Sequence, residues 1–88
     1  MGIKTGHSDQ LQLLGECKPG VRVTIKGLIG GQKMRLRLSE MGLGIDQKLV
    51  VMQNFLYGPV IIQKNDAQIA LGRGQAMKIM VEVINEKA

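Results

Sequence analysis

The chain has 88 residues, of which 44% are apolar, and a formal net charge of +5. This length predicts one domain and excludes a second independent core, because one core already uses most of the apolar surface of so short a chain. The single cysteine and the lack of an apolar run of about 18 residues exclude a disulfide-stabilised secreted domain and a membrane-spanning protein, so we expect a cytoplasmic protein.

Residues 1–10 are polar and aperiodic, which predicts a flexible leader, and the domain itself is expected over 11–88. The apolar patch 11–14 is expected to form a short turn or an edge segment. Lys18-Pro19-Gly20 is a turn signal, and it stands directly before an alternating segment. The folded part should therefore begin close to this turn.

The segment 21–26 alternates between apolar and polar residues, as a half-buried strand requires. Val21, Val23 and Ile25 are expected to face the core, whereas Arg22, Thr24 and Lys26 face outward. Glycines at 27, 30 and 31 then interrupt the pattern, which predicts a bulge or bend before the next element.

A short helix is predicted over 32–41, because this segment contains neither glycine nor proline. Met34, Leu38 and Met41 fall at i, i+4 and i+7, on one face of such a helix. Gly42 follows at the position where a left-handed residue commonly ends a helix. Leu38 and Met41 are therefore expected in the core, with Gly42 as the cap.

The second half of the chain predicts strands at 48–52, 60–64, 67–71 and 79–83. Asn65-Asp66 is a two-residue hairpin turn between the second and third of these strands. Residues 72–77 form a short connection, with room for one helical turn. Five short strands and one helix predict an all-β fold, a small closed or partly closed barrel.

The sequence contains no convincing set of catalytic residues. His7-Ser8-Asp9 has the letters of a triad, but adjacent residues on an extended chain point in different directions and cannot form the required relay. No pair of glutamates has a spacing that calls for acid–base work. We therefore expect a binding module and not an enzyme.

Metal-ligand motifs are also missing, since the sequence has no Cys-x-x-Cys, no His-x-x-x-His and no acidic calcium loop. We expect no tight intrinsic metal site and no required cofactor. A weak site for iron or zinc that uses His7, Glu16, Cys17 or Glu40 stays open. The isolation of Cys17 favours a packed thiol over a metal ligand.

Positive charge is concentrated between Cys17 and Ser39, where no acidic residue occurs. A surface of one sign attracts acidic partners, although a simply solvated basic surface is an equally good interpretation. The candidate partner-binding residues are Arg22, Lys26, Lys33, Arg35 and Arg37. Two aromatic residues near one turn make a poor stacking platform, so we expect no specific nucleic-acid binding.

Three segments together resemble the FeoA (ferrous iron transport protein A) family. They are Leu13-Leu14-Gly15-Glu16-Cys17-Lys18-Pro19-Gly20, then Arg37-Leu38-Ser39-Glu40-Met41-Gly42-Leu43, and finally Ile69-Ala70-Leu71 with Ala76-Met77-Lys78-Ile79. The resemblance implies an SH3-like barrel. It also implies that the motif residues Pro19, Gly20, Leu38, Met41, Gly42 and Leu43 are mainly structural. The family often has two basic residues after the third segment, and Gly72-Arg73 keeps one, which puts the charge of a docking surface near Arg73 in doubt.

The resemblance further implies a cytosolic protein that assists the FeoB ferrous iron transporter, a membrane protein with a cytosolic GTP-binding domain. Contact with the membrane would then be indirect, through the transporter, and self-association stays open. The same fold occurs as the C-terminal domain of iron-dependent repressors. A stand-alone metal-responsive regulatory domain is therefore the alternative, although this chain carries no helix-turn-helix of its own.

Overall fold

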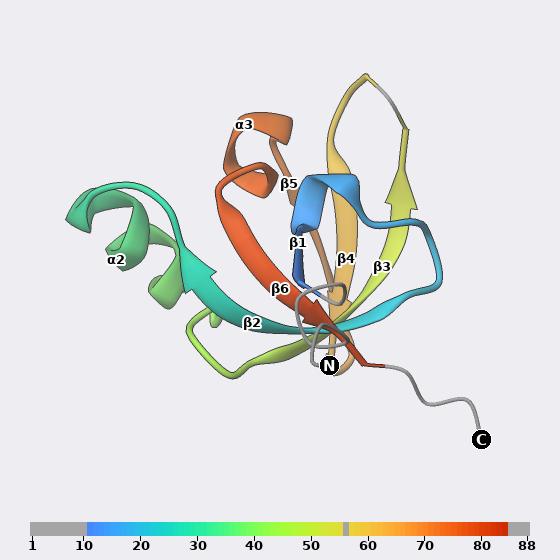
Figure 1. Cartoon of the computed structure of the whole chain (residues 1–88), viewed down its shortest axis with the longest axis horizontal. Coiled ribbons are helices and arrows are strands. Elements are labelled where there is room, and N and C mark those ends of the chain that lie inside the picture. Colours follow the sequence, from blue (N-terminus) through green and yellow to red (C-terminus); the bar gives the residue numbers. More distant parts are fainter. Residues whose placement is uncertain (1–10, 56, 85–88) are drawn as a thin grey trace, which may run out of the picture.

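The computed structural model describes residues 11–55 and 57–84, and Figure 1 shows the arrangement of their elements. The predicted leader over 1–10 lies outside these residues. The elements in chain order are β1 (Leu11–Leu13), the 3-10 turn η1 (Leu14–Glu16), β2 (Arg22–Leu28), α2 (Gln32–Glu40), β3 (Lys48–Asn54), β4 (Val60–Lys64), β5 (Ala67–Leu71), α3 (Arg73–Ala76) and β6 (Ile79–Val83).

The strands form one antiparallel sheet in the order β1-β6-β2-β3-β4-β5. The predicted all-β architecture with one short helix is confirmed. The sheet has six strands where the sequence predicted five, and within the described residues β1 and β5 remain its two unjoined edges. The extra strand is β1, whose three residues pair with β6 and are too few to show an alternating pattern.

The core is built from aliphatic side chains of all the main elements. Thirteen residues of this kind are buried, from Leu14 in η1 to Val81 in β6, and Cys17 is the fourteenth member of the core cluster. Val23 and Ile25 are buried in the core, as their alternation predicted, while Val21 is only partly buried, and Thr24, which was expected to face outward, is buried at 8% exposure. The register of β2 against β6 shifts between Ile25 and Gly27, which is the irregularity that the glycine indicated.

Two turns formed as predicted. At Lys18-Pro19-Gly20, the Val21 N–H donates to the Lys18 carbonyl at 3.3 Å and Gly20 has φ +92°, the pattern of a type II turn. At the tip of the β4–β5 hairpin, Asn65 takes φ +56°, and Lys64 pairs with Ala67 across the turn. Short-range turn chemistry therefore sets the entry to β2 and the register of this hairpin.

Candidate interaction surfaces

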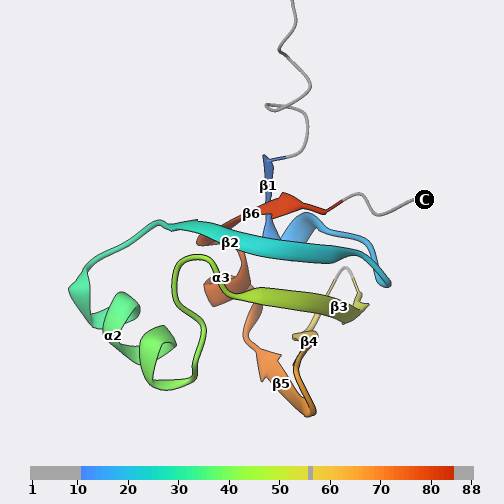
Figure 2. The same cartoon turned by 90° about the horizontal axis from the view of Figure 1, so that it is seen from below.

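Helix α2 stands away from the sheet, beyond the end of β2, in both views of the fold (Figures 1 and 2). Leu38 is its one fully buried residue. Met34 and Met41 pack against the core but remain partly exposed, so the expectation that Met41 lies inside the core is wrong. Met41 follows the last helical residue and is the C-cap, a position at the rim of the core. Most of the helix surface therefore faces solvent.

The C-terminal end of α2 is fixed by a Schellman motif. The Gly42 N–H donates to the Ser39 carbonyl at 2.9 Å, and the Leu43 N–H donates to the Leu38 carbonyl at 2.8 Å. Leu38 and Leu43, the apolar pair that accompanies this motif, are both fully buried. The segment Arg37-Leu38-Ser39-Glu40-Met41-Gly42-Leu43 is thus largely a helix-stop signal, and the structural roles expected of Leu38, Gly42 and Leu43 agree with it.

Gly42 is needed because of its backbone conformation. Its φ of +80° lies in the left-handed region, where a side chain is strained. A Cβ at this position would also come within 3.3 Å of Lys64 Nζ. The Lys64 ammonium therefore lies close to the end of α2, where the helix dipole favours a positive charge.

The solvent-facing surface of α2 combines three cations with one apolar side chain. Lys33, Arg35 and Arg37 are all exposed, and Glu40 is the helix's single carboxylate. Leu36, which lies off the stripe of Met34, Leu38 and Met41, is 62% exposed. It lines an open groove together with Gln32, Lys33, Arg35 and Ser39. We call Lys33, Arg35, Leu36 and Arg37 the α2 surface.

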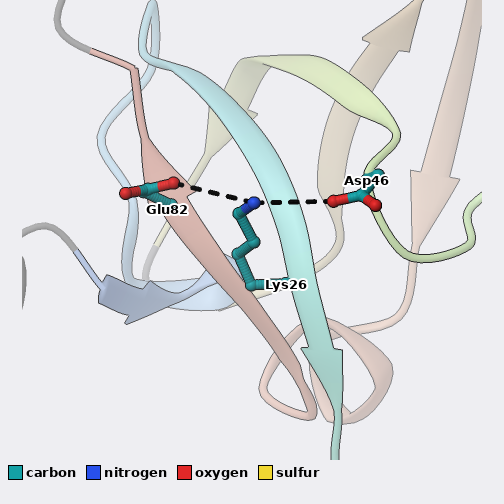
Figure 3. A network of polar contacts seen from close by, with 3 residues as sticks. All are labelled: Lys26, Asp46 and Glu82. Atoms are coloured by element: carbon teal, nitrogen blue, oxygen red, sulfur yellow. Dashed lines mark hydrogen bonds and ion pairs between the residues drawn. The ribbon is translucent and has the colours of Figure 1, made fainter.

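The two remaining candidates, Arg22 and Lys26, do not join the α2 surface. Lys26 Nζ lies 3.5 Å from an Asp46 carboxylate oxygen and 3.9 Å from a Glu82 carboxylate oxygen, so two acids balance its charge (Figure 3). Arg22 is exposed at the first residue of β2, whereas α2 follows the last. A seven-residue strand spans roughly 20 Å. The structure thus gathers three of the five basic candidates and separates the other two from them.

Arg73, which the sequence presented as a charge near a docking surface, forms hydrogen bonds to several segments of the domain. Its Nη1 donates to the Gly15 carbonyl at 3.1 Å, and its Nε donates to the Gly58 carbonyl at 3.2 Å. Its Nη2 donates to Asn54 Oδ1 at 2.6 Å and also to the Phe55 carbonyl. One guanidinium therefore joins α3 to η1, to the end of β3 and to the β3–β4 loop.

Asn54 extends this network. Its Nδ2 donates to the Gly15 carbonyl at 2.9 Å and to the Cys17 carbonyl at 2.7 Å. The pair of side chains, which we call the Arg73–Asn54 clamp, satisfies backbone carbonyls that no strand pairing uses. Sequence reasoning missed this role, since the acceptors come from residues up to 58 positions away along the chain.

The β3–β4 loop carries both aromatic residues of the chain. Phe55 is 64% exposed and Tyr57 is 85% exposed, while the core cluster contains no aromatic residue. Sequence reasoning considered this aromatic pair only as a stacking platform for nucleic acid, and judged it a poor one. A signal was present, because the chain has no charged residue between Lys48 and Lys64 and places its two aromatic side chains near the middle of that run.

Cys17 is a packed thiol, as its isolation favoured. It is 2% exposed, and its Sγ lies 3.6 Å from both Gln12 Oε1 and the Leu13 carbonyl oxygen. Burial, with a smaller contribution from the Glu16 carboxylate, raises the pKa of this thiol to about 11. Within residues 11–55 and 57–84, no three His, Cys, Asp or Glu side chains lie close enough to hold a metal ion, and no helix could cross a membrane. His7 lies outside these residues.

Both the sequence and the structure of the chain are similar to those of known proteins. The FeoA domain model matches residues 12–83. A Methanocaldococcus jannaschii protein named as an Fe(2+) transport protein A is 46% identical over 69 residues, which cover 78% of this chain and 83% of that one. The crystal structure of an iron uptake regulatory protein (FeoA) superposes with a TM-score of 0.80 at 30% identity, covering 84% of this chain and 99% of that one.

A manganese-dependent transcriptional repressor shares the fold alone. Its structure superposes with a TM-score of 0.77 at 21% identity, covering 84% of this chain but 42% of the repressor. More than half of the repressor chain therefore has no counterpart in this alignment.

Proposed function

This chain belongs to the FeoA family, and from that membership we propose that it is a non-enzymatic accessory protein of ferrous iron uptake, docking in the cytosol to the GTP-binding region of a FeoB-type transporter. The observation that carries the proposal is the family match over 12–83, supported by a relative 46% identical that is named for Fe(2+) transport. Iron is then the cargo of the transporter, and the chain acts through protein contact.

The α2 surface is the docking surface in this proposal. Three cations on a helix that stands away from the sheet favour an acidic partner, and Leu36 offers an apolar contact in their midst. The Schellman motif and the burial of Leu38 hold the helix in one orientation. A fixed helix loses little conformational freedom when it binds, which favours association.

Charge reversal on α2 tests this proposal. We would titrate the purified GTP-binding region of the host's transporter with the wild-type chain and with Lys33→Glu and Arg37→Glu, each at low and at physiological salt. Lys48→Glu is the matched control, because Lys48 is an exposed cation on β3. We expect each α2 variant to bind about tenfold or more weakly at low salt, with the difference shrinking as salt screens the charges.

Thermal melting separates a docking defect from an unfolding defect. Substitutions of exposed side chains of this kind change the free energy of unfolding by about 0.5 kcal/mol or less. If the wild type and both well-folded α2 variants bind the GTP-binding region with equal affinity, these cations are ordinary solvated side chains and the proposal is wrong. If Lys48→Glu loses as much affinity as the α2 variants do, binding depends on the net charge of the protein and not on the α2 surface.

A metal-responsive regulatory domain is the second candidate, favoured by the shared fold with the manganese-dependent repressor. Mobility shifts with duplex DNA, with and without Fe²⁺ or Mn²⁺, distinguish the two functions. The accessory role predicts only weak, sequence-independent binding that moderate salt abolishes. A metal-dependent and sequence-dependent shift would favour the regulatory role.

A further inference from the structure

The exposed aromatic residues of the β3–β4 loop, Phe55 and Tyr57, take no part in the proposed docking through α2. Figure 1 shows this loop rising above α3 and η1 at one end of the molecule, while α2 lies at another side. Phe55 and Tyr57 together are the largest exposed apolar side chains of the described residues. Two large exposed apolar side chains in one projecting loop indicate a contact surface more often than isolated exposed residues do.

Two backbone carbonyls in the described part of the loop are held before any contact is made. Arg73 donates hydrogen bonds to the carbonyls of Phe55 and Gly58, and so holds the backbone on both sides of Tyr57. Asn54, directly before the loop, is fixed in turn by Arg73 and by the carbonyls of Gly15 and Cys17. Binding would therefore cost little ordering of the backbone at Phe55 and Gly58.

The charges around the loop favour an anionic lipid surface as its occupant. The run from Leu49 to Gln63 is uncharged, so the tip can enter an interface without desolvating a charge. Lys18 and Arg73 line the surface depression at the base of the loop, where Glu16 is the one carboxylate. Phe and Tyr at a projecting tip, with cations behind them, match the boundary between acyl chains and anionic headgroups.

We propose that the β3–β4 loop is a membrane-interface contact, in which Phe55 and Tyr57 insert at headgroup level into an anionic bilayer while Lys18 and Arg73 stay on the aqueous side. This contact is direct and needs no transporter, in contrast to the indirect association that the family resemblance implied. Two aromatic residues supply only weak and reversible binding. The contact would orient a chain that a second interaction already keeps near the membrane, since two weak attachments reinforce each other.

The test uses the whole chain and protein-free vesicles, either of phosphatidylcholine alone or of equal parts phosphatidylcholine and phosphatidylglycerol. Because the chain has no tryptophan, Tyr57→Trp gives a unique fluorescent reporter at the tip. Leu36→Trp places the control reporter on α2. We expect a blue shift and protection from an aqueous quencher for the Tyr57→Trp protein on anionic vesicles, and little change for the Leu36→Trp protein.

Co-sedimentation with the same vesicles measures the contribution of the aromatic pair. The double variant Phe55→Ser with Tyr57→Ser should lower partitioning into anionic vesicles about tenfold or more. The matched double variant Ile29→Ser with Ile45→Ser removes two exposed apolar side chains that belong to neither proposed contact surface, and it should partition as the wild type does. Melting curves of all variants confirm that they fold.

Three results would overturn the proposal. The first is an unchanged emission of the Tyr57→Trp protein at the highest lipid concentration. The second is equal partitioning of the wild type and the Phe55/Tyr57 double variant, which would leave a purely electrostatic attraction. The third is binding of the loop variants to the transporter's GTP-binding region that is weakened as strongly as that of Arg37→Glu, without any vesicle effect, which would assign the loop to a protein partner.

Discussion

Replacement of Arg73 by Met should destabilise the domain more than substitutions of partly exposed residues usually do. Methionine keeps much of the apolar stem but removes all four hydrogen bonds that the guanidinium donates, including the one to the carbonyl of buried Gly15. A hydrogen bond from a charged group contributes about 1.5–3 kcal/mol when it is buried and less when water can replace it. With most acceptors near solvent, we expect a total loss of about 2–4 kcal/mol.

Thermal and urea unfolding measure this loss. For a domain of this size, 1 kcal/mol shifts Tm by roughly 4–8 °C, so Tm should fall by at least about 8 °C. Lys33→Met is the matched control, since it removes an exposed cation and should change the free energy of unfolding by about 0.5 kcal/mol or less. Asn54→Ala should couple with Arg73→Met in a double-mutant cycle, because the two side chains share the Gly15 carbonyl.

An Arg73→Met protein that melts like the Lys33→Met protein would refute the clamp. So would full additivity of Arg73→Met and Asn54→Ala, because residues in direct contact within one network should show a coupling of about 0.5 kcal/mol or more.

Three further predictions follow from single residues. Gly42→Val should cost about 1–3 kcal/mol in urea unfolding, and wild-type stability would contradict the left-handed cap. Burial raises the pKa of Cys17 from 9.0 to about 11, so the stability that this thiol contributes is complete below pH 9 and is lost between pH 9 and 11. The difference in unfolding free energy between the wild type and Cys17→Ala should therefore fall over this pH range. A difference that stays constant would contradict the burial of the thiol. Lys26→Gln should cost less than about 1 kcal/mol, and less still at high salt, because its ion pairs with Asp46 and Glu82 lie near solvent; a larger cost that salt leaves unchanged would contradict this account.

The sequence was sufficient where local chemistry decides structure. Asn65-Asp66 and Lys18-Pro19-Gly20 formed the predicted turns, because the conformations they require are favoured by the residues themselves. Gly42 ended the helix for the same reason. The strand alternation placed Val23 and Ile25 in the core, since the side-chain period of a strand needs no distant contact to express it.

The sequence was insufficient where distant segments meet. Nothing local distinguishes Arg73 as a clamp from Arg73 as a surface charge, because its acceptors lie in η1 and in the β3–β4 loop. Lys26 looked like an outward-facing cation, and only the packing of β2 beside β6 and the α2–β3 connection brought Glu82 and Asp46 to it. Met41 shared a helical stripe with Leu38, yet it is the C-cap, packs at the rim of the core and stays partly exposed.

Uptake of radiolabelled Fe²⁺ into host cells tests the central claim most directly. In cells that lack this chain but keep the transporter, we predict slow uptake that returns with the wild-type chain and with Lys48→Glu. A folded double variant, Lys33→Glu with Arg37→Glu, should restore little of it at the same expression level. Full restoration by the double variant would contradict docking through α2, and uptake that does not depend on the chain at all would contradict its role in ferrous iron transport.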